Sequence, residues 1–378
     1  RMPRAAYLLV VLSLTLGPTA ASLQSEAPAT SFPEFAADLE EARLALGIPG
    51  MAVAVVGDGE VVFAEGFVLA DVAQDIPATP HTPFGLASVT KPIAATLIMQ
   101  LAAEGAIDLD APIADYGVDA PGSSVVTSRH LLTHTSEGTP GERHVYNGNR
   151  FALLGDVIAG ATGRSFAAEL SDRILIPLEM TDTALNPIDG RTSALRGLED
   201  FRRSLGWSNR YAHYPDVYRR MATPYQFAPD YSTVPGMYHL THTPAAGLAS
   251  SVTDLAAFDI ALDAGTLLST ETRREMLAPA YPIPGGHPGC SYGLGWYVQA
   301  FQGTRIEWHT GRWPPSTSAL YARFPDQGLT LIVLANTDNL TVPFNGLGNG
   351  DVMHSLLSLV FYRHFVFAET HGEVPVSY

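Results

Sequence analysis

The 378-residue sequence holds one cysteine, Cys290. A single thiol cannot form an intramolecular disulfide, and it cannot supply a Cys/His metal cluster. The sequence also lacks H-E-x-x-H and similar ligand spacings. We therefore expect a fold held together by its core, with no metal and no cofactor, and with Cys290 as an ordinary thiol in a loop.

Basic residues are scarce. There are 22 Lys and Arg residues against 38 Asp and Glu residues, which gives a formal net charge of −16. This balance argues against nucleic acid and anionic membrane surfaces as partners, and it favours solubility. Internal repeats and low-complexity tracts are absent, and 46% of the residues are hydrophobic, which is ample for a sizeable core.

Long hydrophobic runs are missing too. The compact apolar run near the start, residues 7–16, is too short to cross a bilayer. Arg1 and Arg4 precede it and the small residues 19–22 follow it, a pattern typical of an export signal. We expect residues 1–21 to be a signal peptide, and the mature protein to be periplasmic or secreted without a stable membrane anchor. The alternative is an ordinary N-terminal helix.

The two ends of the chain predict strands and the middle predicts helices. Near the N-terminus, a helix over 33–46 precedes strands over 50–56 and 61–68, with a tight turn at 57–59. The stretch 84–105 is expected to be a loop that feeds a helix. Further helices are expected over 128–135, 151–161, 165–175, 255–262, 271–277 and 351–365, and strands over 293–301, 305–309, 318–324 and 329–335.

This order favours an α+β fold (an α/β sandwich). One antiparallel sheet built from both termini would be flanked by helices, with a mostly helical lobe inserted. We expect a single domain over 22–365, followed by a tail over 366–378. The sheet region would cover about 34–80 and 285–365, and the lobe about 84–280.

Ser88 and Lys91 stand three residues apart near the start of the helix within 84–105, and this spacing places both side chains on one face. The helix is apolar on all sides from residue 93, as in a buried core helix. A neighbouring base activates a serine nucleophile, and a desolvated lysine has a lowered pKa. The helix N-terminus suits a developing oxyanion. The alternative is an N-capping serine beside a solvated lysine.

Two further elements complete a pattern: Tyr146 at the head of a polar loop, and 309–311 (His-Thr-Gly) at the end of a strand. With Ser88-x-x-Lys91 and the predicted layout, they give the chain a resemblance to the serine β-lactamase and penicillin-binding-protein superfamily. Within it, the chain most resembles class C β-lactamases and family VIII carboxylesterases. The resemblance covers about residues 34–365, and its supporting stretches are 131–136, 151–155, 246–250, 292–296 and 309–311.

The resemblance implies roles for the site residues. Ser88 would be the acylated nucleophile, and Lys91 would help to deprotonate it. Tyr146 would act as general base and then as general acid, and the residue that takes the serine proton first stays open. The backbone N–H groups of Ser88 and Arg312 would form the oxyanion hole.

Two positions depart from the family pattern. Gly148 replaces the asparagine of Y-x-N, and neither Asn147 nor Asn149 is in register to substitute for it. His309 replaces the lysine of K-T-G, so a fixed cation becomes a group that is neutral for much of the time near pH 7. We count His309 among the catalytic residues, and expect Asn147, Gly148 and 310–311 (Thr-Gly) to bind substrate. Both departures weaken recognition of acidic amides and favour esters.

The sequence thus predicts an exported serine hydrolase that cleaves a small-molecule carboxylic ester through a Ser88 acyl-enzyme. The first alternative is a β-lactamase or D-amino-acid peptidase or amidase on the same site. The second is a non-catalytic binding protein that retains the fold. The aromatic-rich segment 190–245 would wall an apolar acyl or alcohol pocket, or else form a structural hydrophobic cluster.

Several other candidates are set aside. The G-x-S-x-G match at 289–293 lacks the required strand before it and helix after it, so we predict that it is not a nucleophile elbow. We expect His130 and His134 to stabilise a loop. The candidates for the pocket lining, poorly supported as metal ligands, are His213, Tyr214, His239 and His242.

Overall fold

The computed structural model describes residues 32–185, 213–228, 232–238, 243–341, 347 and 350–367. The predicted signal peptide, the end of the tail and much of the aromatic-rich segment lie outside these residues. So do the candidate pocket residues Phe201, Trp207, Tyr211, Tyr231, His239 and His242.

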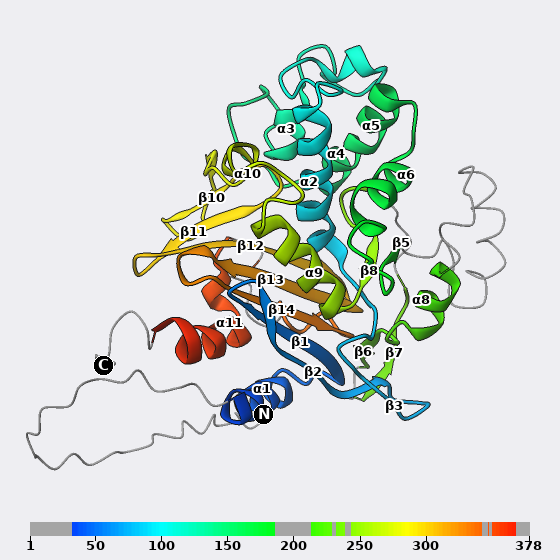
Figure 1. Cartoon of the computed structure of the whole chain (residues 1–378), viewed down its shortest axis with the longest axis vertical. Helices are drawn as coiled ribbons and strands as arrows, with labels where there is room; N and C mark the ends of the chain where they lie inside the picture. Colours follow the sequence, from blue (N-terminus) through cyan, green and yellow to red (C-terminus); the bar gives the residue numbers. More distant parts are fainter. Residues whose placement is uncertain are drawn as a thin grey trace, which may run out of the picture.

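The described residues form a nine-stranded sheet to which both ends of the chain contribute (Figure 1). Its strands in spatial order are β3 (Ile76–Pro77), β2 (Glu60–Asp71), β1 (Gly50–Gly57), β14 (Leu329–Ala335), β13 (Thr317–Phe324), β12 (Thr304–Trp313), β11 (Tyr297–Phe301), β10 (Cys290–Tyr292) and β9 (Tyr281–Pro282). Every pair is antiparallel, and β1 from the N-terminal part lies beside β14 from the C-terminal part. The predicted antiparallel sheet from both termini is confirmed.

The hairpin between β1 and β2 follows from its turn residues. Asp58 and Gly59 both have positive φ, 50° and 78°. A two-residue turn with this geometry matches the natural twist of paired strands, and Asp-Gly is a favoured sequence for it.

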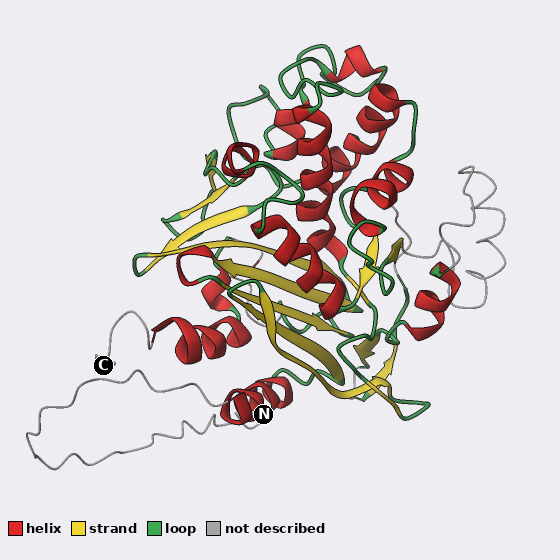
Figure 2. Ribbon diagram, viewed as in Figure 1, coloured by secondary structure: helices red, strands yellow, loops and turns green. Residues whose placement is uncertain are grey.

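Side-chain alternation divides the core between the two faces of the sheet. In β1, Ala52 and Ala54 point to one face, while Val53 and Val55 point to the other. The first face packs against the helical lobe and helix α9 (Val252–Asp263), and the second against α1 (Phe32–Ala45) and α11 (Leu356–Phe361). Figure 2 shows these helices on both sides of the sheet.

The lobe between the two halves of the sheet is mostly helical. Its central helix is α2 (Thr90–Ala103), which a 3₁₀ turn, η1 (Ala87–Val89), precedes. The other helices of the middle part are α3 (Ser128–Leu132), α4 (Gly148–Ala152), α5 (Leu154–Thr162), α6 (Phe166–Leu170), α8 (Tyr214–Arg220) and α10 (Thr270–Met276). The small strands there are β4 (Phe84–Gly85), β5 (Ala184–Leu185), β6 (Tyr225–Phe227), β7 (Thr233–Pro235) and β8 (Leu248–Ser250). Short strands β4, β8 and β5 form a separate small sheet beside η1.

Several predicted boundaries are wrong. The strand predicted over 293–301 begins only at Tyr297, because 293–296 form a bend. The predicted helix over 151–161 starts at Gly148 and is split at Leu153, and the one over 351–365 is divided into short helical segments. Cys290 is not a loop thiol: it is 2% exposed in strand β10, and burial raises the pKa of its thiol to about 12.

Candidate active site

Ser88 lies in the 3₁₀ turn η1, between strand β4 and helix α2. The residue before it, Ala87, has φ of 46°, a left-handed conformation that few non-glycine residues adopt. The Leu86 N–H donates to the carbonyl of Leu248 in strand β8 at 2.8 Å, which holds this turn against the small sheet. Backbone strain of this kind persists only where the surrounding structure enforces it, and it is often found at functional sites.

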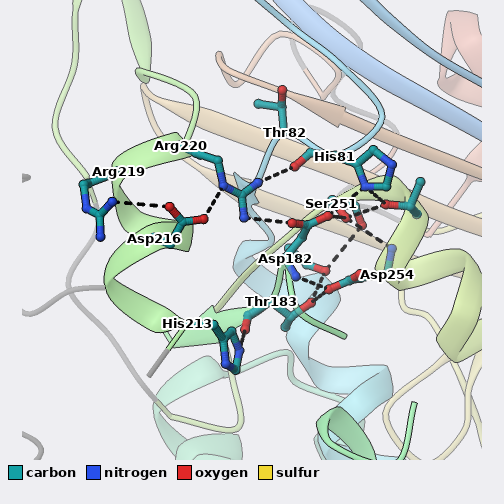
Figure 3. A network of polar contacts seen from close by, with 12 residues as sticks. His81, Thr82, Asp182, Thr183, His213, Asp216, Arg219, Arg220, Ser251 and Asp254 are labelled. Carbon is teal, nitrogen blue, oxygen red and sulfur yellow. Dashed lines mark hydrogen bonds and ion pairs between the residues drawn. The ribbon is translucent and has the colours of Figure 1, made fainter. Parts of the chain in front are cut away.

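A polar network anchors the segment that leads into β4 (Figure 3). His81 contacts the Asp182 carboxylate at 2.9 Å, and Arg220 reaches the same carboxylate at 2.8 Å. The Asp254 carboxylate accepts from the Thr183 hydroxyl at 2.7 Å and from the Asp182 N–H at 2.8 Å. Burial raises the pKa of Asp254 to about 6. The network connects the approach to Ser88 with α8 and with the start of α9.

Lys91 lies one turn further, in the first turn of α2, and is 1% exposed. Its Nζ is 2.9 Å from Ser88 Oγ in a hydrogen bond, and it donates to the carbonyl of Ala245 at 2.8 Å. The amine also lies 4.9 Å from the centre of the Tyr146 ring. Burial lowers the pKa of Lys91 to about 7, because desolvation disfavours the ammonium form.

Tyr146 faces the same serine. Although the residue is 40% exposed, its hydroxyl end is enclosed, and burial raises the pKa of this hydroxyl above its usual value. A hydrogen bond with Ser88 acts in the opposite direction but is the smaller effect. The structure therefore brings together Ser88, a lysine with a lowered pKa and a protonated tyrosine.

Strand β12 closes the site from the sheet side. A Cβ on Gly311 would lie 2.0 Å from the carbonyl oxygen of Leu86 and 3.2 Å from the backbone nitrogen of Ser88. Only glycine allows so close an approach. The strand runs on to Trp313, four residues past the predicted end at His309. This contact sets the backbone around Arg312 beside the turn that carries Ser88, as the predicted oxyanion hole requires.

His309 is 1% exposed and lies behind Tyr146, with the ring centres 6.2 Å apart. Its Nδ1 is 2.7 Å from the carbonyl oxygen of Thr310, which can only accept, so Nδ1 carries the proton. Nε2 then accepts from the Tyr292 hydroxyl at 2.9 Å. Burial, with a smaller contribution from Lys91, lowers the pKa of His309 to about 3, so the ring is neutral near pH 7.

The predicted substrate-binding residues have different environments. Gly148 lines the pocket and is the first residue of α4, with open space where a Cβ would stand. Asn147 caps the same helix: its amide oxygen accepts from Asn149 and Arg150, and its amide nitrogen donates to Glu137. The Thr310 hydroxyl donates across the sheet to the carbonyl of Ala319 at 3.1 Å. The side chains of Asn147 and Thr310 are thus already engaged within the protein.

A pocket of about 300 Å³ opens at Ser88. Its lining residues are Ser88, Lys91, Gly148, Asn149, Ala152, Thr243, Ala245, Ala246, Arg312, Trp313 and Pro314. Among these, the Arg312 guanidinium is paired with Asp338 at 2.8 Å. A second, mainly apolar hollow shares Trp313 with the pocket, and its other lining residues include Phe84, Ala87, Met221, Met237 and Tyr238.

The remaining candidates lie elsewhere. Ser291 stands in the middle of strand β10, so the G-x-S-x-G match is not a nucleophile elbow, as predicted. His130 accepts from the Thr127 N–H in the cap of α3, and His213 contacts the carbonyl of Thr183, away from Ser88. Tyr214 is buried in the core. Among the described residues, no set of His, Cys, Asp and Glu side chains could hold a metal ion, and no helix is long and apolar enough to cross a membrane.

One feature of the sequence that singles out Lys91 was missed. Lys91 is the only lysine in the 378 residues, and every other basic side chain apart from histidine is an arginine. Trp313, which borders both hollows, was also missed, because nothing in its local sequence marks it as part of a site.

Comparison with known proteins shows what this chain is similar to. A family model described as Beta-lactamase matches residues 36–347. A penicillin-binding protein of Bacillus subtilis is 26% identical over 322 residues, 75% of this chain and 67% of its own length. Esterase EstB of Burkholderia gladioli is 39% identical over 129 residues, 32% of each protein. The chain therefore spans about two thirds of the first relative and one third of the second.

A solved structure shows the same fold. The octameric penicillin-binding protein homologue from Pyrococcus abyssi superimposes with a TM-score of 0.71 at 22% identity, covering 89% of this chain and 80% of that protein.

Gly311→Ala is expected to remove most of the reactivity of Ser88. The added methyl group would meet the Leu86 carbonyl oxygen at 2.0 Å, so β12 must move away from Ser88. Loss of one oxyanion donor costs about 10²–10³-fold in kcat. The measurement is the rate of Ser88 labelling by a fluorophosphonate. Gly57→Ala, whose Cβ would make only ordinary 3.4 Å contacts, is the control. Equal rates for both variants would contradict the role of the close approach.

Proposed function

The chain belongs to the Beta-lactamase family, and on that basis we propose that this serine hydrolase cleaves small, uncharged carboxylic esters through an acyl-enzyme on Ser88. The observation that carries the proposal is the state of His309. The family's cationic position is occupied here by a buried imidazole, neutral near pH 7, with both nitrogens bonded within the protein.

Lys91 is assigned as the base that starts the reaction. Its amine lies 2.9 Å from Ser88 Oγ, and its pKa of about 7 leaves much of it unprotonated near neutral pH. Such a pKa is well matched to a general base at that pH. The serine proton passes to Nζ as Oγ attacks the ester carbonyl carbon. The backbone N–H groups of Ser88 and Arg312 then stabilise the negative charge on the carbonyl oxygen by hydrogen bonding.

Tyr146 is assigned as the general acid that donates a proton to the leaving group. Its raised pKa makes it a poor base in the free enzyme, but a phenol remains far more acidic than an alcohol leaving group. When the tetrahedral intermediate collapses and the ester C–O bond breaks, Tyr146 donates a proton to the leaving oxygen and regains one from the Lys91 ammonium. Water then attacks the acyl-enzyme, and the same groups act in reverse order.

The pocket is better suited to a neutral ester than to an acidic amide. Among its described lining residues, the Arg312 guanidinium is already paired with Asp338, so its charge is offset before a substrate carboxylate arrives. Gly148 offers no side-chain amide to hold a substrate amide group. The adjoining apolar hollow has room for only a narrow group and suits a short acyl or alcohol chain. Among the described aromatic residues of the 190–245 segment, Tyr238 lines this hollow, whereas Tyr214, Tyr218 and Tyr225 are buried structural residues.

Two rival functions remain on the same site. An amide hydrolase would need other groups to grip the substrate carboxylate and amide. A binding protein would have no use for a buried lysine beside a serine, since burying an ammonium group without a carboxylate partner costs stability. Export to a periplasm or out of the cell is part of the proposal and rests on the N-terminal sequence pattern alone.

The assay that tests the proposal compares substrates on one preparation. Short p-nitrophenyl esters should be turned over with a higher kcat/KM than a chromogenic cephalosporin, and Ser88→Ala should remove the ester activity. Cephalosporin turnover of comparable efficiency would contradict the ester assignment. Absence of fluorophosphonate labelling at Ser88 would favour the binding protein.

Gly148→Asn should shift selectivity toward amides. Nothing lies within 4 Å of a Cβ at this position, so the side chain fits without displacing a neighbour. The new amide faces the pocket, where it can hydrogen-bond a substrate amide. We expect the cephalosporin-to-ester ratio of kcat/KM to rise by about tenfold, the effect of one good hydrogen bond. Asn149→Ala serves as the comparison for a change beside the same pocket, and an unchanged ratio in Gly148→Asn would contradict the role of this position.

A further inference from the structure

The segment that contains His134 is hydrogen-bonded to the segment that contains Tyr146. The Val145 N–H donates to the main-chain carbonyl of His134 at 2.7 Å. The Asn147 N–H donates to Nδ1 of the His134 ring at 3.1 Å. His134 therefore binds the residue on each side of Tyr146, one through its backbone and the other through its side chain.

The ring of His134 also supports Tyr146 directly. The two ring centres are 4.2 Å apart with an angle of 36° between the planes. His134 is 1% exposed and is enclosed on its other sides by Phe151 and Tyr292, whose ring centres lie 5.4 and 5.1 Å away. The imidazole cannot move without opening a cavity, so it is a rigid backing for the tyrosine ring.

The hydrogen bond from Asn147 fixes the protonation state of His134. Because Nδ1 accepts an N–H, the ring proton must be on Nε2 and the ring must be neutral. Burial holds the pKa of His134 well below its usual value, with smaller contributions from Lys91, His144 and His309. The contact is therefore kept throughout the neutral pH range.

We propose that His134 is a positioning residue that holds Tyr146 in reach of Ser88, by binding both residues that flank the tyrosine and by backing its ring. The proposal rests on the proposed function, in which Tyr146 passes a proton during acyl transfer. A merely loop-stabilising histidine would need the bond to Asn147, but it would not need the ring contact with Tyr146. His130, four residues earlier, provides the contrast, since it caps α3 and has no contact with Tyr146 among its hydrogen bonds.

Two substitutions separate the contacts. His134→Phe keeps an aromatic ring behind Tyr146 and removes the acceptor for Asn147. His134→Asn keeps an acceptor near the position of Nδ1 and removes the ring. Asparagine also tolerates the φ of 55° at this position, so this variant remains informative if the phenylalanine variant fails to fold.

The test is a double-mutant cycle with Tyr146→Phe. The readouts are kcat and KM for a short alkyl ester, whose alcohol leaving group needs the proton that Tyr146 supplies. In the wild-type background, each His134 variant should lower kcat by about tenfold or more, the low end of a general acid–base contribution, with KM changed less than about twofold. In the Tyr146→Phe background, the same substitution should cost less than about twofold. His130→Ala should lower the melting temperature and leave kcat unchanged.

Equal losses in both backgrounds would overturn the proposal, because His134 would then act independently of Tyr146. No loss for either His134 variant would overturn it as well. Full activity of the Tyr146→Phe variant would show that Tyr146 does not pass a proton, which would contradict the proposed function. Because this variant leaves His134 unchanged, it tests the proposed function separately from the role of His134. If the protein proves to prefer amides over esters, the same cycle is measured on a short amide, because its amine leaving group also needs a proton.

Discussion

The site depends on the burial of one amine. Lys91 is enclosed at the start of a helix whose neighbouring residues are nearly all buried, and an ammonium ion there is costly. The protein provides the amine with two hydrogen-bond partners, the Ser88 hydroxyl and the Ala245 carbonyl, and no carboxylate contacts it among the described hydrogen bonds. The charge is destabilised, the pKa falls to about 7, and the amine becomes able to take the proton of the serine beside it.

The rest of the fold buries that amine and holds it beside the Ser88 hydroxyl. The lobe contributes Ser88, Lys91 and Tyr146, and the C-terminal half of the sheet contributes Gly311 and Arg312. The two parts meet where Gly311 lies against the Leu86 carbonyl, so strand β12 and the turn that carries Ser88 share one short contact. His134 and the polar network around Asp182 hold the neighbouring segments in place. Strain at Ala87 is sustained by this surrounding structure.

The sequence was sufficient for the parts that depend on local pattern. The antiparallel sheet, the buried helix and the Ser88–Lys91 pair follow from alternation, apolar periodicity and three-residue spacing. It was insufficient where tertiary contacts decide. Cys290 looks like a loop residue among glycines and prolines, but pairing of β10 with β11 buries it. His134 was predicted to stabilise a loop, and its bonds to Val145 and Asn147 confirm this. Its ring contact with Tyr146 could not be predicted, because the two residues are more than ten positions apart in the sequence. His309 could be identified by motif, but its neutrality depends on Tyr292 and on burial that the sequence does not reveal.

The central claim is that about half of the amine beside Ser88 is neutral near pH 7, and one titration tests it directly. Because Lys91 is the only lysine in the sequence, protein labelled with ¹³C-lysine has a single lysine side chain to observe by NMR. Its Cε resonance should titrate with a midpoint of about 7, the value to which burial lowers the pKa. A midpoint near the usual value of about 10.4 would show a charged amine, and would contradict the assignment of Lys91 as the base.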